Sequence, residues 1–177
     1  MPKAQPGLST RPRIRVFNEA SASVRVGELE RLGEKILARM RSRGCAGVAL
    51  VDDVQMKRLN LRHRRHACTT DVLSFPYEPV PGETKAWRPT PGRARKQAGK
   101  EWLDSRSRSG YLGDIAICWP EARRNARKEG VGTTGEVGRL LLHGLLHLLG
   151  YDHEADHGEM AELEMKLRKE LGLTQAA

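Results

Sequence analysis

Apolar residues recur along this chain with two different periods, and the shorter period predicts four strands. Residues 14–20 (IRVFNEA) begin with alternating apolar positions, and residues 47–53 (GVALVDD) form a short apolar run, so both segments predict strands. A third strand is predicted at 71–78 (DVLSFPYE), where Pro76 indicates a sheet edge or a strand end because proline cannot donate a backbone hydrogen bond. Residues 110–119 (GYLGDIAICW) predict the fourth strand.

Five helices are predicted between and after these strands, from apolar residues three or four positions apart and from terminal signals. Their ranges are Val26–Met40, 54–66, 120–130, Thr134–Leu149 and His157–Leu171. Gly44 can end the first helix, Pro120 suits the first turn of the third, and Thr134 is the expected cap of the fourth. Four strands interleaved with five helices predict one domain of the α+β or α/β class.

Segments without either period flank and interrupt these elements. Residues 1–13 hold three prolines and only basic charges, which predicts a flexible basic tail before a single domain at 14–171. Residues 172–177 are expected to form a second, short tail. Residues 79–109 carry eight Lys or Arg against three Asp or Glu, together with four prolines, and predict an irregular basic insertion in the domain.

The chain is strongly basic, with a formal net charge of +9 and a pI of about 9.9. Such a charge favours a polyanionic partner, either nucleic acid or an anionic membrane surface, although a basic surface that serves only solubility has the same composition. Trp87 and Trp102 lie among the basic residues of the insertion, where indole rings would suit stacking on unpaired bases. A solvated loop without a role is the alternative for this segment.

The cysteines and the apolar runs predict a cytoplasmic protein that does not enter membranes. Cys45, Cys68 and Cys118 are odd in number and far apart, which favours free thiols in a reducing compartment. The first residues lack the apolar run of a signal peptide, and the most apolar stretch, around 140–149, is too short to cross a bilayer.

The eleven residues HGLLHLLGYDH (143–153) hold three of the six histidines of the chain. His143 and His147 are four positions apart, so on a helix they lie on one face and can hold one metal ion between them. Gly150 can adopt the left-handed conformation that ends a helix, and the chain can then fold back and present His153 to the same ion. Three imidazoles with an open fourth position predict a catalytic site for one zinc ion, with nickel or copper as alternatives.

The spacing H-x3-H-x2-G-x2-H matches that of zincin metalloproteases of the metzincin group except at one position. Those enzymes carry a glutamate as general base after the first histidine, where this chain has Gly144. The predicted zincin-like metal helix therefore keeps the metal ligands but lacks the base of a peptidase. Asp152 is either a partner that orients an imidazole or a turn residue, and His157 is expected to begin the last helix and not to bind metal.

Four motifs together make the chain resemble the YbeY family of bacterial endoribonucleases. In chain order they are LNLRHR (59–64), TDVLSFP (70–76), LGDIAI (112–117) and HGLLHLLGYDH (143–153). The resemblance implies an α+β fold with a small four-stranded mixed sheet packed with about five helices, and one zinc ion held by His143, His147 and His153. It also implies a single-strand-specific, metal-dependent endoribonuclease in 16S ribosomal RNA 3′-end maturation and ribosome quality control, with ribosomal RNA and the ribosome or its proteins as partners.

The functional arginine of this family ends an L-N-x-x-Y-R pattern and falls on Arg64, while the tyrosine of the pattern is replaced by His63. The resemblance implies that Arg64 acts in catalysis, and its planar guanidinium offers a fork of donors to a phosphate. Arg62 and Arg65 flank it and are candidate RNA-binding residues that would hold neighbouring phosphates. A solvated helix face is the alternative for these two.

Two other functions fit part of the pattern. A metal-dependent peptidase of the zincin type would need a base from a position other than Gly144. A ribosome assembly factor would use the metal for structure, but structural zinc sites usually close with four ligands and the motif offers three. Neither the residues nor the resemblance predicts an oligomeric state.

Overall fold

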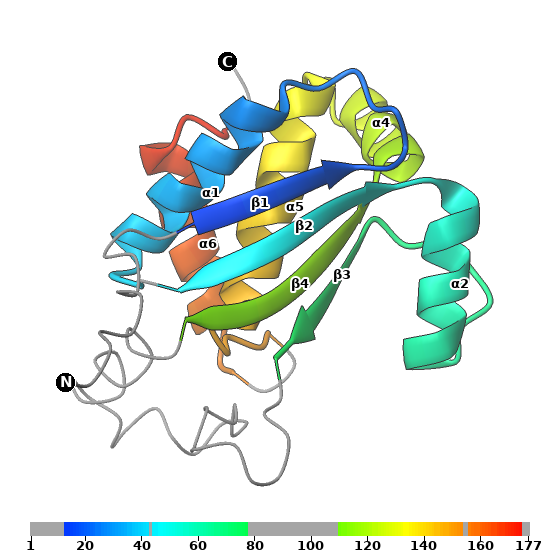
Figure 1. Ribbon diagram of the computed structural model, residues 1–177. Coiled ribbons are helices and arrows are strands. Elements are labelled where there is room, and N and C mark those ends of the chain that lie inside the picture. The colour runs from blue at the N-terminus through cyan, green and yellow to red at the C-terminus, as the bar shows by residue number, and fades with distance from the viewer. Residues whose placement is uncertain (1–12, 43, 78–109, 154–155, 175–177) are drawn as a thin grey trace, which may run out of the picture.

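The computed structural model describes residues 13–42, 44–77, 110–153 and 156–174 (Figure 1). In chain order the elements are β1 (Arg13–Asn18), α1 (Val26–Arg39), β2 (Cys45–Val51), α2 (Asp53–Arg64), β3 (Val72–Pro76), β4 (Tyr111–Cys118), α4 (Trp119–Lys128), α5 (Thr133–Leu148) and α6 (Glu159–Glu170). The four predicted strands and five predicted helices are confirmed, and their bounds differ from the prediction by at most two residues. The predicted insertion at 79–109, with Trp87 and Trp102, lies outside the described residues, as does nearly all of the predicted basic tail.

The four strands form one mixed sheet in the order β1-β2-β4-β3. Strands β1, β2 and β4 run parallel, and β3 pairs antiparallel with β4 at the edge of the sheet. Pro76 is the last residue of this edge strand, as its missing backbone donor predicts. The α+β class and the four-stranded mixed sheet are therefore confirmed.

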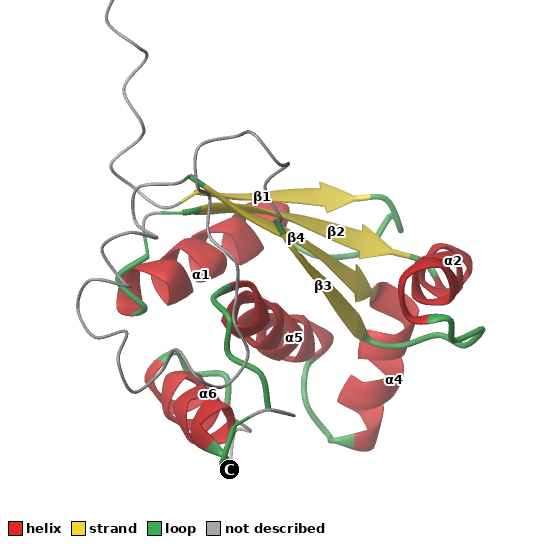
Figure 2. Ribbon diagram, turned by 90° about the horizontal axis from the view of Figure 1, so that it is seen from below, coloured by secondary structure: helices red, strands yellow, loops and turns green. Residues whose placement is uncertain are grey.

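Side chains alternate between the two faces of the sheet, so the strands contribute to two separate cores. On β4, Ile115 and Ile117 face the main core, whereas Ala116 and Cys118 face the opposite side. Figure 2 shows α1, α4, α5 and α6 together on the side of the main core. The smaller core lies on the other face, where Met56 of α2 packs near the carboxyl ends of β2 and β4.

Helix α5 is the central element of the main core, where it contacts β3, β4, α1, α4 and α6. Five of its leucines are completely buried, Leu141, Leu142, Leu145, Leu146 and Leu148. Burial of one leucine side chain contributes about 1.5–3 kcal/mol to the free energy of unfolding. Packing of these leucines therefore fixes the position of α5 and of the side chains on its other face.

Gly144 allows a close approach between α5 and β4. A Cβ atom at this position would lie 2.9–3.2 Å from three side-chain carbons of Ile115, which is 1% exposed. Glycine therefore allows the helix to close onto the strand. Any side chain at position 144 would be directed into the core of the sheet, which explains why the glutamate of the zincin pattern has no place here.

The start of α2 corrects the predicted end of the second strand, which stops at Val51 and not at residue 53. The carboxylate of Asp52 accepts a hydrogen bond from the backbone N–H of Gln55 (2.7 Å), and the Gln55 side chain accepts one from the N–H of Asp52 (3.0 Å). This reciprocal capping box satisfies two backbone donors and begins the helix directly after the strand.

Two other predicted helix starts are wrong by a small margin. Thr134 is not the cap of α5, because the helix begins at Thr133 and Gly132 precedes it without a side-chain bond. His157 does not begin α6, which starts at Glu159. The carboxylate of Asp156 accepts from the backbone N–H groups of Gly158 and Met160, both at 2.8 Å, and so caps this helix from a position outside it.

The three cysteines are free thiols, as predicted. Among the helices that the structure describes, none combines the length and the apolar character that a bilayer span requires.

Gly144→Ala is expected to destabilise the protein because the added methyl group forces Ile115 away from α5, and overpacking of this kind costs roughly 1–3 kcal/mol. Gly135→Ala in the same helix is the matched control, since no atom lies within 4 Å of a Cβ at that position. The control should gain about 0.5–1 kcal/mol from helix propensity. Urea unfolding measures both, and equal stabilities of the two variants would contradict the close contact.

Candidate metal centre

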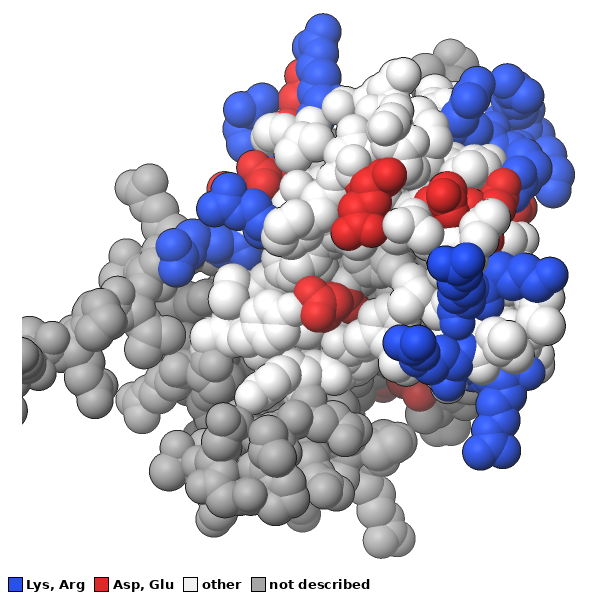
Figure 3. Space-filling model, turned by 45° about the vertical axis from the view of Figure 1, so that its right-hand side comes forward, with Lys and Arg blue, Asp and Glu red and all other residues white. Residues whose placement is uncertain are grey.

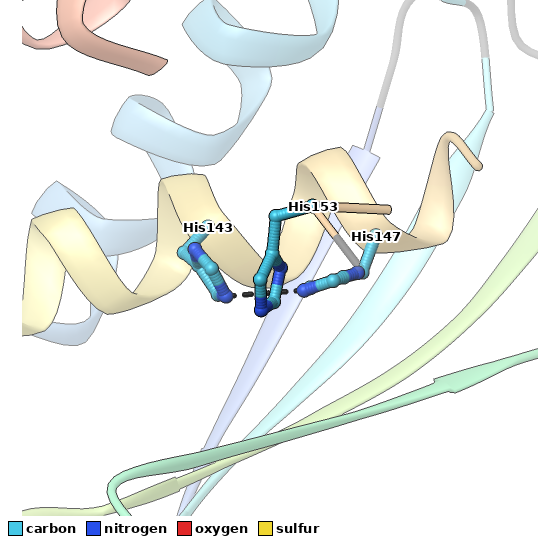
Figure 4. Close-up of side chains that lie close together, drawn as sticks. All are labelled: His143, His147 and His153. Atoms are coloured by element: carbon cyan, nitrogen blue, oxygen red, sulfur yellow. Dashed lines mark hydrogen bonds between the residues drawn. The ribbon is translucent and has the colours of Figure 1, made fainter. Parts of the chain in front are cut away.

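Three histidines come together at the carboxyl end of α5 (Figure 4). His143 and His147 project from one face of the helix, and His153 reaches them from the segment that follows it. The Nε2 atoms of His143 and His147 lie 3.1 Å apart. One ring nitrogen from each histidine lies within 4.8 Å of the other two. The structure thus brings together the three residues that the sequence singled out as metal ligands.

This arrangement fits a transition-metal ion. Two nitrogens bound to one zinc ion at about 2.0–2.1 Å with tetrahedral geometry lie about 3.3 Å apart, so small rotations of the rings suffice to share an ion. Imidazole nitrogen is a ligand that zinc, nickel and copper all accept. Within the described part of the chain, the group that could hold an ion consists of these three histidines, which leaves a fourth position without a protein ligand.

The turn after α5 determines where His153 lies. Gly150 has a φ of 81°, the left-handed conformation that the sequence predicts for it. Its N–H donates to the carbonyl of His147 (2.8 Å), and the N–H of Tyr151 donates to the carbonyl of Leu146 (3.0 Å). These two bonds form a Schellman motif, which ends the helix and reverses the chain toward the ligand face of α5.

Glu164 on α6 holds the first histidine in position. This carboxylate is 8% exposed, and its Oε2 accepts a hydrogen bond from Nδ1–H of His143 at 3.1 Å. Its Oε1 accepts from the guanidinium of Arg168 at 2.6 Å. Since a carboxylate can only accept, the proton of a neutral His143 lies on Nδ1, and Nε2 presents a lone pair toward the other histidines.

The electrostatic surroundings favour an ionised Glu164 and a neutral His147. Burial opposes ionisation of Glu164, but the hydrogen bond from His143 and the charge of Arg168 outweigh it and lower the pKa of the carboxyl. The pKa of His147 is also lowered, first because the ring is buried and then because His143 and His153 lie beside it. A neutral imidazole is the form that binds metal.

Glu164 is the site residue that the sequence reasoning missed. A signal for it exists, because Glu164 occupies the buried stripe of α6 between Met160 and Leu167. An acid within an apolar stripe indicates a buried partner. Asp152, the partner considered from the sequence, lies in the wall of the cleft beside His153.

A cleft of about 750 Å³ lies over the histidines, and Arg64 is part of its wall. One wall consists of α5 and its turn, with the three histidines. The other consists of Arg64 at the end of α2, of His66 in the segment after it, and of residues 70–76, which lead into and form β3. Arg62 and Arg65 are exposed on α2 and directly after it, but they are not among the residues that line this cleft.

Arg64 is placed by the way in which α2 ends. Arg65 is in the left-handed conformation (φ 60°) and stops the helix directly after Arg64. The side chain of Asn60 is buried and donates to the carbonyl of Cys68 at 2.9 Å, which ties the following loop back to the helix. His63 packs its ring against Phe75 of β3, with ring centroids 4.8 Å apart.

Residues of β3 connect the two walls of the cleft. The hydroxyl of Ser74 donates to the carbonyl of Gly144 in α5 at 3.3 Å, which joins the edge strand to the metal helix. The carboxylate of Asp71 accepts from the N–H of Val72 (2.8 Å) and from the side-chain amide of Asn125 (3.4 Å). Asp71 therefore fixes the start of β3 at the rim of the cleft.

Comparison with known proteins identifies relatives over most of the chain. The family model described as "Endoribonuclease YbeY" matches residues 16–172. A relative named Endoribonuclease YbeY from Solibacter usitatus is 34% identical over 157 residues, which are 89% of this chain and 86% of the relative. One of the same name from Thermobifida fusca is 36% identical over 159 residues, 87% of this chain and 90% of the relative. The solution structure of TM1509 from Thermotoga maritima is 26% identical, with a TM-score of 0.57 over 89% of this chain and 88% of that one.

Glu164→Gln is expected to weaken zinc binding by roughly 10–100-fold, because loss of the carboxylate frees the ring orientation and the proton position of His143. Glu162→Gln on the same helix is the control, since Glu162 is exposed. Competition with a chromophoric chelator measures the affinity, and circular dichroism verifies the fold. Equal zinc affinities of the two variants would refute the positioning role of Glu164.

Proposed function

Because this chain belongs to the YbeY family of endoribonucleases, we propose that it is a zinc-dependent endoribonuclease that cuts single-stranded ribosomal RNA. Its substrate is the 3′ end of 16S ribosomal RNA, and the same activity serves ribosome quality control in the cytoplasm. One domain at 14–171 carries the activity. The observation that supports the proposal most directly is the cleft in which the three histidines and Arg64 lie together.

The histidines and the arginine have complementary roles in this proposal. Zinc on His143, His147 and His153 would supply Lewis acidity toward a phosphoryl oxygen and would lower the pKa of a water molecule to about 7. Cleavage of a phosphodiester adds negative charge to the phosphate in the transition state. The guanidinium of Arg64, on the opposite wall, donates to that charge and orients the phosphate.

Arg62 and Arg65 extend the phosphate contact of Arg64 along the RNA strand. Both are exposed and lie within two residues of Arg64 in the chain. We assign them to the phosphates next to the scissile one, where they add affinity without a part in the chemical step. The ribosome or its proteins are the partners that bring the cleft to its substrate.

The alternatives fit the site less well. A zincin peptidase needs a base next to its first ligand, and a side chain at Gly144 would meet Ile115 within 3.2 Å. An assembly factor with a structural metal needs a closed site, but the group in the described chain offers three ligands. A peptide-library digest beside an RNA digest distinguishes peptidase from nuclease.

Arg64→Ala is expected to retain zinc and fold while its kcat on single-stranded RNA falls by roughly 10²–10³-fold, the usual loss when one donor to a developing charge is removed. Arg64→Lys keeps the charge but not the fork, so its activity should lie between those of the alanine variant and the wild type. Arg31→Ala, an exposed position on α1, controls for the lost charge. Cleavage by Arg64→Ala at the wild-type rate would disprove the assigned role.

His147→Ala is expected to lose the bound zinc ion and with it all cleavage, because two imidazoles hold zinc far more weakly than three. His157→Ala is the matched control, since His157 is exposed and lies outside the histidine group. Elemental analysis gives the metal content. Treatment of wild type with a strong chelator should abolish cleavage and added zinc should restore it, whereas activity in metal-free protein would exclude the zinc mechanism.

A further inference from the structure

The positive charge of the described chain is concentrated on two helices that are distant in sequence. Helix α2 contains four basic residues and one acid, and α4 also contains four and one. By contrast, bases and acids balance in α1 and α5, and α6 has one acid in excess. The net charge of +9 therefore does not describe a uniformly basic surface.

The basic side chains of these helices are exposed. On α2 they include Lys57, Arg58 and Arg62, and on α4 Arg123 and Arg127. Ion pairs in the described part of the chain involve a single base of the two helices, Arg124, which contacts Asp53 and Glu121. The other exposed bases thus keep their full charge available for a partner.

Helices α2 and α4 form one side of the molecule, next to the metal cleft. Arg124 of α4 binds the first residue of α2, Asp53, at 2.6 Å, which joins the two helices at that point. Figure 3 shows Lys and Arg side chains gathered over this side, with acidic side chains between them. Lys57, Arg58, Arg123 and Arg127 are hereafter called the α2/α4 basic surface.

Both helices also lead to the candidate metal centre. The last residue of α2, Arg64, lines the cleft itself. The last residue of α4, Lys128, lines a neighbouring hollow of about 510 Å³ that shares Asp71, Val72 and His143 with the cleft. A nucleic acid that leaves the cleft on this side therefore meets Lys128 of α4, beside the acids Glu129 and Glu136 of the same hollow.

The four side chains of the α2/α4 basic surface offer charged donors to phosphates and no aromatic ring to a base. Apart from His63, the exposed residues of α2 and α4 are basic or aliphatic. The aromatic rings of these helices are engaged elsewhere, His63 on Phe75 and Trp119 against the main core. Proteins that recognise unpaired bases commonly stack them on aromatic rings, whereas paired RNA presents phosphates outward and keeps its bases stacked inside.

We propose that the α2/α4 basic surface binds the phosphate backbone of paired RNA adjacent to the single strand in the cleft. The inference rests on the proposed function, and it specifies the substrate as a single strand joined to a stem. The stem supplies affinity and position, and the cleft performs the cut. Sequence reasoning did not indicate the contribution of α4.

The test compares two RNAs, a single-stranded oligonucleotide and the same strand extended by a hairpin stem. The variant replaces Lys57, Arg58, Arg123 and Arg127 with Gln. The control replaces four exposed bases of α1 and α6, Arg31, Lys35, Lys166 and Lys169, with Gln, so that both proteins lose the same charge. Fluorescence anisotropy over a series of salt concentrations gives the affinities, and gels verify that the RNA remains intact.

For the stem-bearing RNA, the surface variant is expected to bind more weakly than the control. The salt dependence of its affinity should be weaker. The plot of log K against log salt becomes less steep by ~0.7–0.9 for each phosphate contact removed. The preference of the wild type for the stem-bearing RNA should persist in the control and disappear in the surface variant. Equal loss on both RNAs would mean that the surface binds single strands, which overturns the assignment to paired RNA.

Cleavage assays of wild type separate this inference from the proposed function. If wild type cuts neither RNA, the proposed nuclease function is wrong. If wild type cuts RNA but the surface variant keeps the same stem preference and salt slope as the control, the nuclease stands and the α2/α4 basic surface has no role in binding paired RNA.

Discussion

The close contact between α5 and β4 is the constraint on which the site depends. Gly144 brings the helix against Ile115, and this contact fixes the rotation of α5 about its own axis. Once that rotation is fixed, His143 and His147 lie on the face that meets the cleft, because residues four apart share a face. The same contact excludes a side chain at position 144, so the contact that places the two histidines also excludes the glutamate base of a zincin peptidase.

Around this helix, two independent structural features complete the candidate metal centre. The Schellman motif at Gly150 reverses the chain and returns His153 to the ligand face. Glu164 approaches from α6 and sets the orientation of His143, while Arg168 holds the carboxylate in turn. His143 and His153 are thus each restrained by a contact outside their own side chains, and restraint of this kind reduces the rearrangement that binding of an ion requires.

Local features of the site could be predicted from the sequence, and long-range features could not. The spacing of His143 and His147 and the left-handed Gly150 depend on backbone geometry within a few residues. Glu164 was missed because its role depends on which face of α6 packs against α5. The sequence showed that Gly144 was not glutamate, but the reason lies in Ile115, a residue of a neighbouring strand. The pairing of basic helices α2 and α4 likewise appears only when the chain is folded.

The candidate metal centre has a short span along the chain, which affects the order in which its parts can fold. His143 and its carboxylate partner are 21 positions apart, whereas the bond from Ser74 that joins the opposite wall to α5 connects positions 70 apart. Closure of short loops precedes closure of long ones, because the entropic cost rises with loop length. The three imidazoles can therefore come together and bind an ion before the wall of the cleft that contains Arg64 has formed.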